Sequence, residues 1–148
     1  MIKKLLILFF FLGSFYMQAQ GMVWKTNMND AIVLGDEQKR PLLIYFTAAG
    51  MSQRYQTEIF NTPDFVVWSR DNVILVKLDL SDETMSDVAK EQNVKLKNAL
   101  GVQELPQTCL VMASVRKGKT TFNNLGIVPY KQGGAKAWIV DANLVLNP

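Results

Sequence analysis

The sequence predicts an α/β fold in which a mixed central sheet carries helices on both faces. Two apolar runs, residues 42–46 and 73–80, alternate with segments whose apolar residues have helical spacing. Such alternation is typical of parallel strands joined by helical crossovers. Two further strand-like segments then flank a short turn, and a last amphipathic segment follows them. We therefore expect the element order β-α-β-α-β-α-β-β-α.

The first part of this order is a short edge strand, a helix and a central strand. Residues 22–25 are expected to form the edge strand and residues 26–38 the helix, with Thr26 or Asn27 as its N-cap. Residues 42–46 have the sequence Leu-Leu-Ile-Tyr-Phe, with no charged residue. A continuous apolar strand of this kind is typical of a sheet centre that is covered on both faces.

Two helical pieces are expected between the two apolar strands. The first should begin near Ser52, whose hydroxyl is a good N-cap. Thr62 and Pro63 interrupt it and begin the second piece, because threonine suits a cap and proline suits the first helical position. This second piece should extend to about residue 70.

The remaining elements follow in a simple order. After the strand at residues 73–80, a helix is expected over residues 85–100. Strands near residues 108–112 and 120–125 are predicted to form a hairpin around a turn that contains Lys-Gly. The last helix follows Gly134, and its apolar residues are spaced for one face.

The first twenty residues are predicted to be a secretory signal peptide. Lys3 and Lys4 form a basic start, and residues 5–12 are almost purely apolar. This apolar core is shorter than the roughly 20 residues that a membrane-spanning helix needs. We expect cleavage near residue 20, a periplasmic or secreted domain of residues 21–148, and no stable membrane insertion afterwards. An uncleaved anchor is the alternative.

The composition excludes several classes of function. The chain has no histidine, which excludes histidine acid–base catalysis, Ser-His or Cys-His nucleophile pairs and histidine-ligated metals. Cys109 is the single cysteine, so no intramolecular disulfide can form. Without Lys3 and Lys4 the formal net charge falls from +3 to +1, and the other basic residues are scattered. We therefore expect no nucleic-acid partner, no metal and no cofactor.

Two segments carry a resemblance to a known family. The strand ending at Phe46 leads into the loop Thr47-Ala48-Ala49-Gly50-Met51, and about fifty residues later Leu105-Pro106-Gln107 leads into another apolar run. This pairing resembles the thioredoxin superfamily, in which a helix start carries Cys-x-x-Cys and faces a later cis-proline. The resemblance covers about residues 24–146 and implies a thioredoxin-like fold.

The cysteine pair of that superfamily is missing here. When the loop is aligned on Phe46, as in secreted thioredoxin-like proteins, the two cysteine positions become Ser52 and Tyr55. With the shorter loop of ordinary thioredoxins, they become Met51 and Arg54. The site is degenerate in either alignment, because neither places a thiol at the helix start.

Other positions depart from the family pattern as well. Tyr45 stands where many thioredoxins have a buried acid, and Gln107 follows the proline where the family usually has threonine. We interpret Cys109 as a buried structural residue, since free cysteine is among the most buried residue types. A reactive thiol is the alternative, although no neighbour in the sequence would lower its pKa.

The side chains at the helix start have plain structural interpretations. Ser52 is interpreted as an N-cap and not as a nucleophile, because no histidine is present to act as its base. Tyr55 is expected to pack into the former active-site groove, with a phenol that faces a ligand as the alternative. Arg54 is either a solvated side chain or a fork that grips a carboxylate.

The resemblance also implies a binding site that needs no thiol. In thioredoxin-like proteins the backbone beside the cis-proline pairs with an extended substrate peptide, as in strand addition. The candidate binding residues are Met51, Ser52, Gln53, Arg54, Tyr55, Leu105, Pro106 and Gln107.

The leading hypothesis is a redox-inactive, thioredoxin-like binding module whose partner is an extended polypeptide or an envelope protein. The alternative is a residual thiol-disulfide oxidoreductase that acts through Cys109. A third possibility is a structural subunit of an envelope assembly, with aromatic side chains at its interface. Core positions are the favoured interpretation of these aromatic residues, which are Trp24, Phe65, Trp68 and Trp138.

Overall fold

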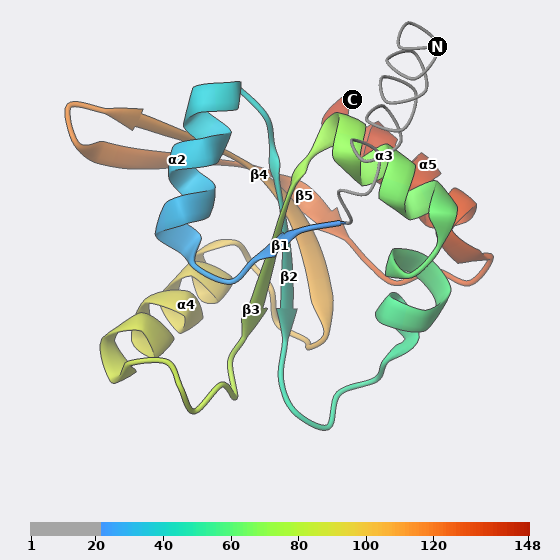
Figure 1. Ribbon diagram of the computed structural model, residues 1–148, viewed down its shortest axis with the longest axis horizontal. Helices are drawn as coiled ribbons and strands as arrows, with labels where there is room; N and C mark the ends of the chain where they lie inside the picture. The colour runs from blue at the N-terminus through green and yellow to red at the C-terminus, as the bar shows by residue number, and fades with distance from the viewer. Residues whose placement is uncertain (1–21) are drawn as a thin grey trace, which may run out of the picture.

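A five-stranded mixed sheet in the order β1-β3-β2-β4-β5 organises the computed structural model, which describes residues 22–148 (Figure 1). The predicted signal peptide lies outside the described residues. β1 and β2 run parallel to β3, whereas β4 is antiparallel to both β2 and β5. The strands are β1 (Trp24–Lys25), β2 (Leu42–Thr47), β3 (Ile74–Asp79), β4 (Gln107–Arg116) and β5 (Lys119–Val128).

Helices cover both faces of this sheet, as the sequence predicts. η2, α3 and α5 lie on one face, and α2 and α4 lie on the other (Figure 1). The helices are α2 (Met28–Gln38), the π-helix η2 (Tyr55–Phe60), α3 (Pro63–Asn72), α4 (Asp87–Ala99) and α5 (Gly134–Leu146). All six residues of β2 are buried, because this central strand is covered on both faces.

The caps explain where the predicted helices begin. Asn27 is the N-cap of α2, and its Oδ1 accepts from the backbone N–H groups of Asn29 at 2.8 Å and Asp30 at 3.3 Å. Thr62 caps α3 as predicted, with its Oγ1 accepting from Phe65 N at 3.3 Å. Each cap satisfies N–H groups that have no partner within the helix.

The predicted helix start at Ser52 is wrong. η2 begins at Tyr55, and its N-cap position, Arg54, makes no capping bond through its side chain. The hydroxyl of Ser52 accepts from Arg54 N at 3.3 Å, inside the loop that precedes η2. The i→i+5 bond from Asn61 N to Gln56 O, at 2.9 Å, belongs to the wider turn of a π-helix.

The hairpin at the end of the sheet is longer than predicted. β4 and β5 have ten residues each, and they pair up to Arg116 and Lys119. The two turn residues, Lys117 and Gly118, have φ values of 52° and 74°. Positive φ at both central positions is the backbone of a tight type I′ hairpin turn, whose twist matches that of the strands.

The large aromatic residues form the core on the η2, α3 and α5 face. Phe65 and Trp138 are fully buried, Trp68 is almost so, and the half-buried Trp24 packs against Phe65 with ring centroids 6.3 Å apart. Ring pairs at such separations add to the stabilisation that burial gives. The interpretation of these four side chains as core residues is confirmed, with Trp24 at the edge of the core.

Candidate functional site

The β2–η2 loop and the segment before β4 meet at one end of the sheet. Phe46, near the end of β2, pairs with Gln107, the first residue of β4. The loop that leaves β2 therefore starts beside the residue that follows Pro106. The Leu105–Pro106 peptide bond is cis.

The loop is fastened on its other side by residues that the sequence interpretation missed. Ala49 N donates to Ser81 Oγ at 2.7 Å, and Ser81 Oγ donates to Asp79 Oδ1 at 2.6 Å. Asp79 Oδ1 also accepts from Ser81 N at 2.9 Å, which is an Asx turn at the end of β3. The Asp-x-Ser pattern after an apolar strand is the signal that could have shown this turn, although not its contact with the loop.

Tyr55 fills the interior between the loop and β4. Its side chain is only 2% exposed. Its hydroxyl donates to Gln107 Oε1 at 2.9 Å and lies 3.3 Å from the carbonyl oxygen of Val128. Burial raises the pKa of Tyr55 to about 12, so the phenol is neutral at physiological pH. The packing interpretation of Tyr55 is confirmed. In the alignment on Phe46, the position of the second cysteine of the pair is therefore occupied by a buried phenol.

Tyr45 adds a second neutral ring beneath Tyr55. The two ring centroids lie 5.4 Å apart, and Tyr45 is 1% exposed. Burial raises the pKa of Tyr45. This position therefore holds a buried phenol that is neutral near pH 7.

The rim of the site is more accessible than its interior. Ser52, Gln53 and Arg54 are exposed, whereas Met51 is half-buried. The side chain of Gln53 donates to Met51 O at 3.3 Å, so part of the loop's polar capacity is used within the loop. Across from the loop, the three residues Leu105, Pro106 and Gln107 are half-buried.

Arg54 lies over an aromatic ring that the sequence interpretation did not connect with it. Its guanidinium carbon is 5.7 Å from the ring centroid of Tyr130, a cation–π contact. The hydroxyl of Tyr130 donates to Glu58 Oε2. This hydrogen bond and the negative charge of Glu58 raise the pKa of Tyr130. Arg54 is exposed, as the solvated interpretation requires, and its fork is held over the Tyr130 ring.

Cys109 lies on the other side of the sheet from Tyr55. It is fully buried in β4 between Ile44 and Ile127, in the cluster that packs under α2 and α4. Tyr55 belongs to the opposite cluster. Burial raises the pKa of the Cys109 thiol to about 12, so the thiolate is scarce near neutral pH. The interpretation of Cys109 as a buried structural residue is confirmed.

The described residues offer neither a metal-binding group nor a membrane-spanning helix. Within residues 22–148, no three histidine, cysteine, aspartate or glutamate side chains come together as a group that could hold a metal ion. No helix in that same range has the length and apolar character needed to cross a membrane.

Comparison with known proteins supports the fold that these observations describe. A solved structure described as DsbH oxidoreductase superimposes with a TM-score of 0.67 at 18% sequence identity, covering 86% of this chain and 86% of that chain. The chain has a thioredoxin-like fold. A thioredoxin from Thermus thermophilus gives a TM-score of 0.61 at 11% identity, covering 85% and 88% of the two chains.

The same comparisons leave the chemistry of this thioredoxin-like protein open. No protein-family model matches the chain, and no curated protein matches it either. At these identities the likeness concerns the fold alone, so function has to be argued from the site. The predicted fold is confirmed, and no cysteine lies at or before the start of η2, because Cys109 is the single cysteine of the sequence.

We predict that Tyr55→Phe lowers the free energy of unfolding by about 1 kcal/mol, because a buried hydrogen bond to Gln107 is lost. The loss should be moderate, since Thr108 N still donates to Gln107 Oε1 and Thr108 Oγ1 still donates to Val128 O. Urea unfolding measures the difference. Tyr130→Phe is the matched control and should change stability less, because its hydroxyl bonds at the surface. Equal losses in the two variants would contradict the role of the Tyr55 hydroxyl.

We also predict that Cys109 makes stability fall at alkaline pH. The folded state raises its pKa from 9.0 to about 12, so its contribution is complete below pH 9 and is lost as pH rises towards 12. The stability gap between the wild type and Cys109→Ala should therefore narrow by about 1 kcal/mol from pH 8 to pH 10. Urea unfolding under reductant at both pH values tests this. A constant gap would mean that the thiol ionises as easily in the folded protein as in the unfolded chain.

Proposed function

We propose that this chain is a secreted or periplasmic binding module that holds an extended polypeptide without covalent chemistry. The proposed groove lies between the β2–η2 loop and the segment Leu105–Gln107. The Tyr55–Gln107 hydrogen bond carries the proposal. Through this bond the neutral side chain of Tyr55 occupies the interior beside the β2–η2 loop. The residues of the surrounding rim are exposed or half-buried, so a partner can reach them.

The backbone of the segment before β4 supports this function. Among the described residues, positions 103–106 form no hydrogen bond through their backbone N–H or C=O groups, and the pairing of β4 begins only at Gln107. Backbone groups tend strongly to be satisfied, by protein or by water. An extended peptide placed beside Leu105 would find main-chain partners there, in the manner of strand addition. This mode of binding needs backbone geometry and no cysteine.

The side chains of the rim indicate what such a peptide would present. Met51 and Leu105 are half-buried apolar residues on the two sides of the groove. Arg54, held over Tyr130, adds a positive charge with a planar donor fork. An extended segment that carries an apolar side chain next to a carboxylate is complementary to this rim.

The alternative function, thiol-disulfide exchange through Cys109, requires an accessible thiolate. Cys109 has no exposed surface, and burial raises its pKa to about 12. Forming a mixed disulfide would require the sheet cluster under α2 and α4 to open. The observations therefore favour non-covalent binding over the residual oxidoreductase.

A binding experiment with thiol-free probes tests the proposal. The probes are a panel of fluorescently labelled, cysteine-free, unstructured peptides, and anisotropy reports their affinity for the full mature chain. Arg54→Glu and Leu105→Asp should each lower the affinity for the tightest-binding peptide by roughly tenfold, which corresponds to about 1.4 kcal/mol of binding free energy. Cys109→Ser should bind as the wild type does.

Arg116→Glu is the matched control, because Arg116 is also exposed but lies in the hairpin next to the turn. It should leave the affinity unchanged. The proposal fails if no peptide binds, or if the two rim variants bind as well as the control. Because the probes contain no sulfur that could form a disulfide, weaker binding by Cys109→Ser would show only that the substitution disturbs the fold, which circular dichroism checks.

A further inference from the structure

A pocket of about 490 Å³ lies at the other end of the sheet from the proposed groove. β1 pairs with only two residues of β3, Leu75 and Val76, whereas β2 pairs with β3 over its full length, starting at Ile74. The short edge strand thus leaves the start of β3 without a strand partner on that side. The pocket occupies this place, between α2 and α3.

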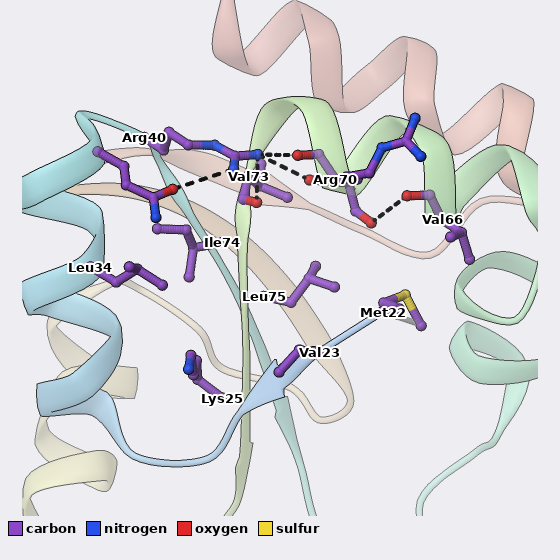
Figure 2. Close-up of a pocket in the computed structure, with 12 residues that line it drawn as sticks. Met22, Val23, Lys25, Leu34, Arg40, Val66, Arg70, Val73, Ile74 and Leu75 are labelled. Atoms are coloured by element: carbon purple, nitrogen blue, oxygen red, sulfur yellow. Dashed lines mark hydrogen bonds between the residues drawn. The ribbon is translucent and has the colours of Figure 1, made fainter. Parts of the chain in front are cut away.

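The floor of the pocket is apolar. Figure 2 shows Leu34 from α2 beside Ile74 and Leu75 of β3, with Val23 below them and Val66 of α3 on the far side. Pockets that take small ligands have volumes of about 300–1,000 Å³ and are lined mainly by apolar side chains with a few polar groups. The volume and the floor of this pocket therefore suit an aliphatic chain.

The charges around the floor have one sign. Lys25, Arg40 and Arg70 line the pocket, and no aspartate or glutamate does. Arg70 is paired with Asp71 at 3.2 Å, and Figure 2 shows its guanidinium turned away from the other lining residues. The backbone of Lys25 pairs with β3, but its side chain forms no hydrogen bond or ion pair with any residue of the described range 22–148. Its ammonium is therefore available to a ligand.

Arg40 gives the pocket a second positive charge at a fixed place. Its Nη2 donates to the carbonyl oxygens of Arg70 at 2.6 Å and Val73 at 3.0 Å. These acceptors carry no formal charge, so they hold the guanidinium in position without neutralising it. Figure 2 shows Arg40 above the floor and Lys25 below it. The apolar floor thus lies between two cations.

We propose that this pocket binds an anionic amphiphile, an aliphatic carboxylate whose tail covers Leu34, Ile74 and Leu75. The carboxylate pairs with Lys25, and Arg40 adds to the positive potential. The aliphatic tail is complementary to the apolar floor. The negative head is complementary to the charged lining residues, which are all cationic. The site is separate from the peptide groove, because it lies at the start of β3 and the groove lies beyond the end of β2.

Dodecanoate, kept below its micelle concentration, is the probe for this site. Isothermal titration should show saturable binding of one dodecanoate per chain. Acetate has the head without the tail, and dodecyltrimethylammonium has the tail with the opposite charge, so both should bind far more weakly. Comparable binding of dodecyltrimethylammonium would mean simple apolar adsorption and would overturn the proposal, as would the absence of saturable dodecanoate binding.

Variants locate the binding in this pocket. Lys25→Glu should lower the affinity for dodecanoate by about fivefold or more, which is the scale of a partly exposed ion pair. Leu34→Ser should also weaken dodecanoate binding, because it removes an apolar contact with the tail. Lys119→Glu makes the same charge change on the exposed hairpin and should have no effect. Lys25→Gln, a milder change, covers the case in which Lys25→Glu does not fold, as circular dichroism would show.

Equal affinity in the Lys25, Leu34 and Lys119 variants would place the ligand elsewhere and refute the site. The peptide experiment is independent of this result. Lys25→Glu should keep the peptide affinity of the wild type, so that failure of one proposal leaves the other standing.

Discussion

The hydrogen bond from Tyr55 to Gln107 is the contact on which the organisation of the site depends. It joins the first residue of η2 to the first residue of β4, two positions separated by 52 residues in the chain. The Tyr55 ring also packs on Tyr45 and on Phe60, with ring centroids 5.4 and 5.6 Å away. One side chain thus connects η2 with β2 and with the residue that follows Pro106. A thiol at this position would provide neither the hydrogen bond nor the ring contacts.

This contact helps to hold a thioredoxin-like frame in which the start of η2 carries no cysteine. The interior beside the β2–η2 loop contains neutral aromatic rings, among them Tyr45 and Tyr55, and burial raises the pKa of both phenols. The single thiol lies in the other core cluster, where burial raises its pKa. At the surface beside this interior, the backbone groups of residues 103–106 form no hydrogen bond with the described residues. This is the part of the frame that we propose as the peptide site.

Features dominated by burial could be predicted from the sequence. Residues 42–46 are apolar throughout, and a central strand is the arrangement that buries such a run on both faces. The α3 start was also predictable, because Thr62 and Pro63 act through local bonds and a fixed φ. The same holds for Cys109, whose burial follows from the apolar strand around it.

Features that depend on distant partners could not be predicted. η2 begins three residues later than expected because Ser52 bonds within the loop, and the burial of Tyr55 then sets the start of the helix. The contact between Tyr130 and Glu58 joins residues 72 positions apart, and no local pattern shows it. The pocket beside β3 exists because β1 is only two residues long, a length that depends on packing at the sheet edge.

The most direct test of the central claim is capture of partners from a cell-envelope extract, with the mature protein as bait and elution with and without reductant. Non-covalent binding predicts that wild type and Cys109→Ser capture the same partners, that these elute without reductant, and that Arg54→Glu captures less of them. Partners that are released only by reductant and are lost in Cys109→Ser would contradict it, because they would show that Cys109 performs thiol chemistry in this frame.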